Sequence, residues 1–159
     1  MQLVLEMKST EEPAAFTRVM LVSEGAPQGP KLKAETPWVL ADLISRLVKG
    51  EPQESFISVA LDARRNVLAV VRVSMGTLTQ SMAHPREVFR VAFLANAAAV
   101  IVAHTHPSGD PSPSPDDHAC TRRLREAADV VGVPLLDHII VGTDGTGSFY
   151  SYSESGWKF

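Results

Sequence analysis

The sequence predicts a mixed α/β fold in which helices pack against a single sheet. Two observations predict it. Short, almost wholly apolar runs with the length of buried strands alternate with segments whose apolar residues recur at helical spacing. The expected order is helix, strand, strand, helix, strand, helix, strand, with a short last strand near the C-terminus. With 159 residues, of which 45% are apolar and 21% charged, the chain has the size and composition of one domain that can bury a core.

The first clear helix is expected to begin at Thr36-Pro37, because threonine is a good N-cap and proline suits the first helical position. Gly50 can end this helix. Two β-rich runs follow, Phe56–Leu61 and Val67–Val73, with a polar turn between them. Because both runs are nearly all apolar, we expect this hairpin to lie near the centre of the sheet.

The second half of the chain repeats a helix-then-strand pattern. Residues 85–97 have the amphipathic spacing of a helix, and Ala98–Ala103 is a short buried strand that leads directly into two histidines. A loop rich in proline, serine and glycine comes next. Ser114 opens another helix that runs to about Val131, and Leu135–Val141 is one more buried strand before a short one at 149–152.

The first 35 residues are predicted to be an N-terminal extension, and residues 36–159 the domain. Within the extension, Gln2–Met7 and Phe16–Val22 are two candidate short strands separated by proline-rich and glycine-rich breakers. The start of the chain lacks the charged and apolar regions of a secretory signal, and no apolar run has the length of a membrane span. We therefore expect a cytoplasmic protein that has no membrane partner.

Charge and cysteine content exclude several classes of protein. The formal net charge of −3 excludes a globally basic nucleic-acid binder, although it leaves room for a local basic patch. The single cysteine, Cys120, excludes an intramolecular disulfide framework and any zinc site built from several cysteines. The five histidines are the unusual resource of this small acidic chain.

Two of these histidines can converge on one point. His104 and His106 lie two residues apart at the end of a strand, so their side chains share a face, and Asp117 lies on the first turn of the next helix. Two imidazoles and a carboxylate suit a catalytic zinc ion, which keeps a fourth position open. The alternative is a simple helix cap, with Ser114 at the N-cap and Asp117 at the third helical position. The buried strand favours the metal site, because desolvating two unpaired imidazoles costs free energy.

The residues in and around this pair resemble a known family. The string His104-Thr105-His106-Pro107, followed by Ser114 and Asp117, resembles the JAMM motif of MPN/JAB-domain metalloproteases. The longer pattern is similar to the RadC family over residues 36–155, and the similar segments are residues 84–90, 95–99, 104–110 and 136–142. The resemblance implies an MPN/JAB-like, cytidine-deaminase-like domain, a mixed sheet flanked by helices. Thr105 departs from the family, which usually has asparagine there.

The resemblance also implies roles for particular residues. It implies that His104, His106 and Asp117 hold Zn²⁺, and that a glutamate upstream of the motif acts on the metal-activated water. Glu54 best fits that place, just before the strand that starts at residue 56, and Glu87 is the less favoured alternative. Ser114 would donate a hydrogen bond to the developing oxyanion, in competition with its role as the N-cap.

Four more residues are candidates for supporting roles near the site. Ser108 and Asp110 lie in the loop after the histidines and could touch substrate, although a polar turn explains them equally well. Asp137 or a backbone carbonyl could accept a hydrogen bond from the free ring nitrogen of a ligating histidine. His138 is expected to support the ligands from behind or to be structural, with direct metal ligation the lesser alternative.

Three functions follow from these features. The first is a zinc-dependent hydrolase of the JAMM type that cleaves a peptide or isopeptide bond. The second is a DNA-repair-associated role, which the resemblance to RadC implies; its support is weak, because acidic residues follow the basic cluster Arg122, Arg123 and Arg125, and residues 1–35 show no helix-hairpin-helix module of the kind found in longer relatives. The third is a metal-free interaction scaffold, against which the retention of every ligand-type residue argues.

Overall fold

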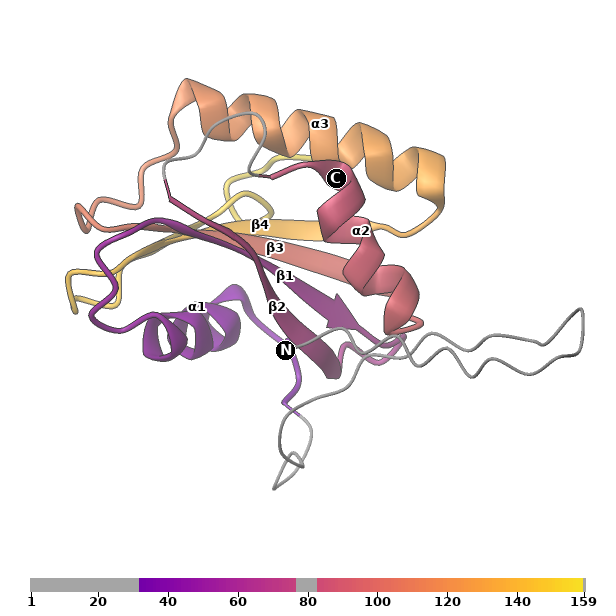
Figure 1. Cartoon of the computed structure of the whole chain (residues 1–159), viewed down its shortest axis with the longest axis horizontal. Helices are drawn as coiled ribbons and strands as arrows, with labels where there is room; N and C mark the ends of the chain where they lie inside the picture. Colours follow the sequence, from indigo (N-terminus) through magenta and orange to yellow (C-terminus); the bar gives the residue numbers. More distant parts are fainter. Residues whose placement is uncertain (1–31, 77–82, 159) are drawn as a thin grey trace, which may run out of the picture. The chain divides into compact units, whose positions relative to one another are not determined.

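One mixed five-stranded sheet with helices on both faces forms the described part of the chain (Figure 1). The structure, a computed structural model, describes residues 32–76 and 83–158, so the two strands expected within residues 1–35 lie outside the described residues. The elements are α1 (Pro37–Leu47), β1 (Ser55–Leu61), β2 (Val67–Met75), α2 (Pro85–Leu94), β3 (Ala99–His106), α3 (Pro115–Val131), β4 (Leu135–Gly142) and β5 (Phe149–Ser151). The strand order is β2-β1-β3-β4-β5; β3 and β4 are parallel, and the other neighbours are antiparallel.

The sheet separates two hydrophobic cores. On one face, α1 buries Leu40, Ala41 and Ile44 against the sheet. On the other face, α2 and α3 together bury a second apolar cluster that includes Phe89 and Leu124 (Figure 1). The predicted α/β fold with helices packed against a sheet is therefore confirmed, and it has three layers.

Strand alternation decides which core each side chain of β3 enters. Ile101 and Ala103 belong to the α1 core, whereas Val100 and Val102 belong to the core under α2 and α3. Because side chains alternate with a period of two, the two histidines that follow continue the row of Val100 and Val102. They therefore face the side of the sheet that α3 covers.

The expected place of the hairpin in the sheet is wrong. β1 is wholly buried and lies between β2 and β3, but β2 is the edge strand and is only partly buried. Its apolar residues face the cores on both sides, since Val67 and Val70 pack on the α1 core and Val73 on the other. An edge strand with apolar residues on both faces therefore has the same sequence pattern as a central strand.

Several boundaries differ from the sequence-based expectation, and two of the differences concern the site and the extent of the domain. β3 continues through His106 instead of ending before the histidines, because its parallel pairing with β4 extends to the pair His106 and Gly142. The segment before α1 also joins the domain. Lys33 forms a β-bridge with Asn66, and Ala34 is buried in the α1 core.

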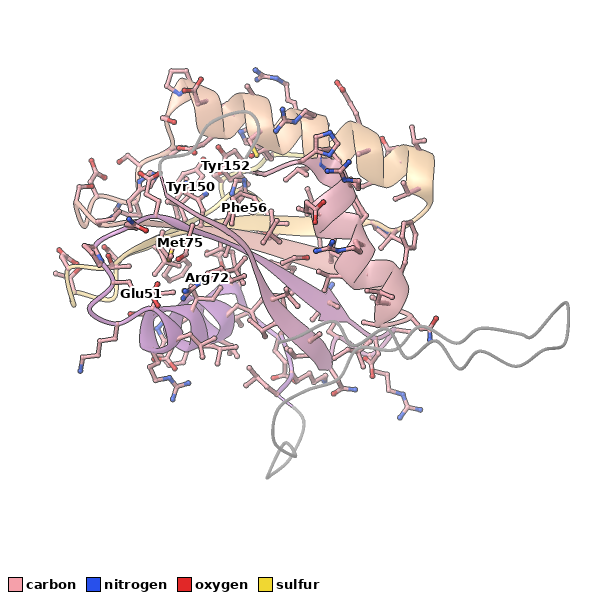
Figure 2. The ribbon with its side chains drawn as sticks, viewed as in Figure 1. Glu51, Phe56, Arg72, Met75, Tyr150 and Tyr152 are labelled. Carbon is pink, nitrogen blue, oxygen red and sulfur yellow. The ribbon has the colours of Figure 1, made fainter. Side chains whose placement is uncertain are left out.

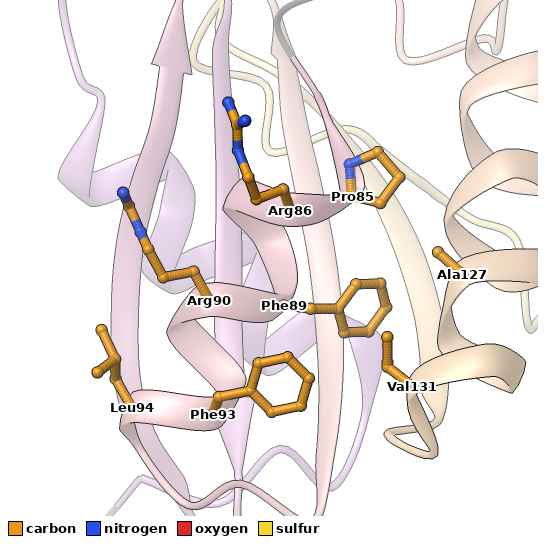
Figure 3. A pocket seen from close by; sticks show the side chains of 8 residues that line it. All are labelled: Pro85, Arg86, Phe89, Arg90, Phe93, Leu94, Ala127 and Val131. Carbon is orange, nitrogen blue, oxygen red and sulfur yellow. The ribbon is translucent and has the colours of Figure 1, made fainter.

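A shallow apolar groove runs between α2 and α3 (Figure 3). It has a volume of about 340 Å³, and its residues are Pro85, Arg86, Phe89, Arg90, Phe93, Leu94, Ala127 and Val131. None of these residues belongs to the polar cluster described below. Across the described ranges, none of the helices combines the length and apolar character needed to span a bilayer.

Candidate metal centre

His104, His106 and Asp117 meet where the end of β3 faces the first turn of α3. The Nε2 atom of His104 lies 3.0 Å from Oδ1 of Asp117 and 3.0 Å from Nε2 of His106. The Nε2 atom of His106 lies 3.6 Å from Oδ2 of Asp117. One potential ligand atom from each residue falls within 4.8 Å of the others, so the three side chains can hold a metal ion.

One carboxylate oxygen of Asp117 caps α3, and the other faces the histidines. Its Oδ2 accepts hydrogen bonds of 2.7 Å from both the backbone N–H and the hydroxyl of Ser114, and its own N–H donates to the Ser114 hydroxyl oxygen over 3.2 Å. This is the predicted capping box at the start of α3. Its Oδ1 faces His104. The cap therefore holds the carboxylate toward the histidines, and the two interpretations of this segment are compatible.

A loop carbonyl orients His106. Its Nδ1 lies 2.8 Å from the backbone oxygen of Asp110, which can only accept, so Nδ1 bears a hydrogen and Nε2 faces the site. The loop lies tightly against the end of β4. A Cβ on Gly142 would collide with the backbone of Gly109, whose own φ of +86° favours glycine. Gly109 and Gly142 thus allow the loop to place the Asp110 carbonyl against the His106 ring.

His104 is supported from behind by a second buried imidazole. Its Nδ1 lies 2.8 Å from Nε2 of His138, and the Nδ1 of His138 lies 2.6 Å from the hydroxyl of Thr121. That hydroxyl donates to the backbone oxygen of Asp117 over 2.7 Å. Sequence analysis did not single out Thr121. The available signal was its position one helical turn after Asp117, a polar residue on the buried side of an otherwise apolar helix face.

Aromatic rings enclose the buried histidines. Phe56 stacks on His104 with ring centroids 6.0 Å apart and an interplanar angle of 8°, and Tyr152 stacks on His138 at 5.1 Å and 7°. Both rings are labelled in Figure 2. Phe56 and Tyr152 are themselves almost inaccessible to solvent, so they shield His104 and His138 from water.

The two histidines of the cluster have pKa values shifted in opposite directions, because His104 is buried more deeply than His106. Burial lowers the pKa of the fully buried His104, against the opposing effect of Asp117. The hydrogen bond to Asp117 raises the pKa of the less buried His106. Burial alone would raise the pKa of Asp117, but hydrogen bonds from both histidines and from Ser114 outweigh it and hold that pKa well below its usual range. Asp117 is therefore an anion throughout the physiological pH range.

Glu54 lies beside this cluster and immediately precedes β1 in the chain. Its negative charge contributes to raising the pKa of both His104 and His106, after the larger effects of burial and Asp117. Its position is set by its neighbours in the chain: its backbone oxygen accepts from Gly76 over 2.8 Å, and the next residue, Ser55, donates its N–H to the Thr105 hydroxyl over 2.9 Å. Thr105 of β3 thus contacts the residue that follows Glu54.

The loop that precedes Glu54 is tied to the edge strand. The Glu51 carboxylate pairs with Arg72 at 2.7 Å and accepts from the Ser55 hydroxyl at 3.3 Å, and Arg72 also contacts the sulfur of Met75. Figure 2 labels Glu51, Arg72 and Met75, which gather at this end of the sheet. Hydrogen bonds and an ion pair thus hold the segment that places Glu54 near the histidines.

Other candidate residues lie away from the three ligands. The carboxylate of Glu87 pairs with Arg86 and Arg90 on the surface of α2, at 3.0 and 2.8 Å. Ser108 is exposed in the loop after β3. The Asp110 side chain accepts from the N–H of Ser112, so its carboxylate stabilises a turn while its carbonyl orients His106.

The sequence left open whether Asp137 or a backbone carbonyl contacts a metal-binding histidine, and the structure has a backbone carbonyl, that of Asp110, in this place. Asp137 caps the far side of β4, where it accepts from the N–H groups of His138 and Ser153 and from the hydroxyl of Ser151. The reason is strand alternation, since adjacent residues 137 and 138 point to opposite faces of the sheet. The carbonyl of Asp110 and the ring of His138 make the contacts for which Asp137 was a candidate.

The remaining histidines have structural contacts. His84 is the N-cap of α2 and accepts from the N–H of Arg86. His118 stacks on Trp157 with ring centroids 5.5 Å apart and contacts the hydroxyl of Tyr152 at 3.0 Å.

The donor set fits a cation. Nitrogen and carboxylate oxygen are the ligand atoms that catalytic zinc sites use, and two histidines with one acidic residue leave a position open. Nε2 of His106 faces the Asp117 carboxylate and the Nε2 atom of His104. A positive charge placed among these atoms would satisfy all three groups together. The residues thus fit a metal ion.

Comparison with known proteins gives consistent matches. The sequence model of the RadC-like JAB domain matches residues 34–157. A UPF0758 protein of Trichlorobacter lovleyi is 45% identical over 121 residues, which cover 76% of this chain and 51% of the relative. A UPF0758 protein of Shouchella clausii is 44% identical over 122 residues, covering 77% and 52%, respectively. The chain spans about half the length of the curated relatives it matches.

Proposed function

The chain belongs to the family of proteins with a RadC-like JAB domain, and from this premise we propose that it is a zinc-dependent hydrolase that cleaves peptide or isopeptide bonds. The predicted family and its JAB/MPN-like fold are confirmed. The observation that carries the proposal is the convergence of His104, His106 and Asp117, with Glu54 beside them.

In this proposal Nε2 of His104, Nε2 of His106 and a carboxylate oxygen of Asp117 hold Zn²⁺. A bound zinc ion supplies a Lewis acid that lowers the pKa of water toward 7 and polarises a scissile carbonyl. The backbone and side-chain contacts already described keep the three ligands in place: the cap orients Asp117, the Asp110 carbonyl orients His106, and His138 orients His104.

Glu54 acts as general base and then as general acid. Its carboxylate takes a proton from the attacking water while the water oxygen bonds to the carbonyl carbon, and it returns that proton to the amine as the carbon–nitrogen bond breaks. Ser114 donates its hydroxyl hydrogen to the oxyanion that forms. Since that hydrogen is otherwise donated to Asp117, the hydroxyl has to rotate from its capping position during the reaction.

A peptide or protein substrate is the partner that this chemistry requires. The alternative, a role at DNA, is less well supported because two of the three arginines of the basic cluster already donate to main-chain carbonyls. Arg123 donates to Ala83 and Arg125 to Lys158. The other alternative, an interaction scaffold, does not require a preorganised set of ligand atoms.

The proposal is tested with protein purified without chelators. Metal analysis should find about one zinc ion per chain, and His106→Ala should lose it. A peptide and isopeptide library should then be cleaved by the wild type, with at least a hundredfold loss of rate in Glu54→Gln, which keeps the shape but not the basicity. Glu87→Gln is the matched control and should cleave at the wild-type rate, because its carboxylate pairs on α2.

Three results would contradict the proposal. They are a chain that takes up no zinc, a zinc-loaded chain that cleaves no amide, and cleavage that is unchanged in Glu54→Gln. Retention on DNA that weakens steeply with salt, in a protein without amidase activity, would favour the nucleic-acid alternative.

A further inference from the structure

We propose that the apolar groove between α2 and α3 docks an amphipathic helix of a partner protein, and that this helix carries carboxylates along one edge. The described residues that line the groove are not those of the candidate metal centre, so the inference does not depend on the proposed hydrolysis. Three observations define the occupant: an exposed apolar surface, walls that are both helical, and a positively charged edge.

The groove has an apolar surface that is open to solvent. Phe89 is almost completely buried in the core beneath α2 and α3, whereas Phe93, one turn further along α2, is 55% exposed. Val131 on α3 is 37% exposed. Figure 3 shows the rings of Phe89 and Phe93 turned toward the wall that Ala127 and Val131 form. Covering these apolar groups with apolar side chains of a partner would remove them from water and favour binding.

The helical walls favour a helical occupant. An extended peptide binds best where an unpaired sheet edge satisfies its backbone, and the described lining residues all belong to α2 or α3 instead. A helix satisfies its own backbone hydrogen bonds and presents apolar residues at intervals of three and four along one face. The ten residues of α2 extend for about 15 Å, which matches a partner helix of about three turns.

The edge of the groove along α2 is positively charged. Among the described lining residues, Arg86 and Arg90 are the charged ones, and their side chains are 76% and 57% exposed. Both pair with the same carboxylate, that of Glu87, so two positive charges on this edge face one negative charge. The lining residues on α3, Ala127 and Val131, are uncharged. A partner helix with carboxylates on the side that lies over α2 is therefore complementary in charge.

The test uses three labelled peptides of about twelve residues, each cross-linked between side chains so that it is helical. The first has leucine at positions i, i+3, i+4 and i+7 and glutamate along one flank. The second has lysine in place of glutamate, and the third has alanine in place of leucine. Fluorescence anisotropy with the full chain should show at least about tenfold tighter binding of the first peptide than of either other peptide. Added salt should reduce the preference for glutamate over lysine.

Matched variants locate the binding in the groove. Phe93→Ala should weaken binding of the glutamate peptide at least about tenfold, and Arg90→Gln should weaken it about three- to tenfold. The controls, Trp38→Ala and Arg46→Gln, lie on α1, which covers the other face of the sheet. Trp38 is 60% exposed, and Arg46 pairs with an acid of its own helix, as Arg90 does. Both controls should bind the glutamate peptide as tightly as the wild type.

Three results would overturn the inference. They are a folded wild type that does not bind the glutamate peptide, equal or tighter binding of the lysine peptide, and binding that is unchanged in Phe93→Ala. A chain that sediments as a dimer, and as a monomer in Phe93→Ala, would assign the groove to a second copy instead. Failure of the proposed hydrolysis looks different, because the glutamate peptide would still bind to a chain that takes up no zinc.

Discussion

At the scale of single residues, the local backbone decides what each histidine does. His104 and His138 lie on adjacent parallel strands and on one face of the sheet, so their rings meet. His84 precedes α2 as its N-cap, and His118 lies on α3 and stacks on Trp157. The same side chain is thus a candidate ligand, a support or a cap according to its element.

Cys120 is one residue whose chemistry burial suppresses. Burial raises the pKa of its thiol to about 11, so the reactive thiolate is scarce at pH 8. We expect iodoacetamide at pH 8 to label the folded chain at least a hundredfold more slowly than the urea-unfolded chain, measured by mass spectrometry. Because the thiol ionises more readily when unfolded, stability should fall as pH rises from about 9 toward 11. Equal labelling of both states would contradict the burial.

Thr105 connects β3 to the start of β1 through its side-chain hydroxyl. Thr105→Val should lower the free energy of unfolding by about 1–3 kcal/mol, because the N–H of Ser55 loses its acceptor in a buried position. Urea denaturation measures this loss. Thr105→Ser keeps the acceptor and should stay within about 1 kcal/mol of wild type. If Val and Ser were equivalent, the hydroxyl would have no role in holding the strand that follows Glu54.

At the scale of elements, the start of α3 connects packing to chemistry. The helix buries Leu124 and Ala128 in the core beneath it, and this packing fixes the distance from its first turn to the end of β3. The capping box then rotates Asp117 toward the histidines. A helix cap and a ligand set are therefore built from the same residue.

Ser114 allows the two roles of this turn to be separated. Ser114→Ala should destabilise the chain by about 0.5–2 kcal/mol and Ser114→Gly by only a few tenths, because glycine is tolerated at an N-cap and alanine is not. Both variants lack the hydroxyl, so both should lose amide cleavage to a similar extent if Ser114 serves the oxyanion. Thermal unfolding and peptide cleavage measured side by side check this. Activity that follows stability across the two variants would indicate that only the cap matters.

At the scale of the whole molecule, the sheet separates a structural core from the core that borders the candidate metal centre. The α1 core is almost wholly apolar, whereas the other core borders the polar row from Thr121 to His106. A metal ion held by His104, His106 and Asp117 would link β3 to α3. The free energy of metal binding should therefore add to the stability of the folded chain.

Zinc should raise the melting temperature of the metal-free chain. At free zinc one hundred times its dissociation constant, the stabilisation is about 2.7 kcal/mol, which corresponds to a shift of roughly 5–15 °C. Differential scanning calorimetry with a chelator and then with added zinc measures it. His106→Ala is the control and should show no shift. A shift of equal size in that variant would place the zinc elsewhere.

Much of the fold and of the ligand set follows from local pattern. The apolar runs and helix starts indicated every element of the described domain, and the spacing of two residues put His104 and His106 on one face before any contact was known. The Ser114 cap was also readable, because capping depends on residues three positions apart. These features are short-range in the chain, so sequence alone determines them.

The tertiary structure decided what depends on long-range pairing. Sequence could not place β2 at the sheet edge, since apolar residues on both faces suit an edge or a central strand. Nor could it choose between Asp137 and a backbone carbonyl as the acceptor behind the ligands, because that choice depends on how β4 and the loop after β3 lie against the histidines. The contact between Thr121 and His138 depends on the packing of α3 over β4, because it joins side chains 17 residues apart in the chain.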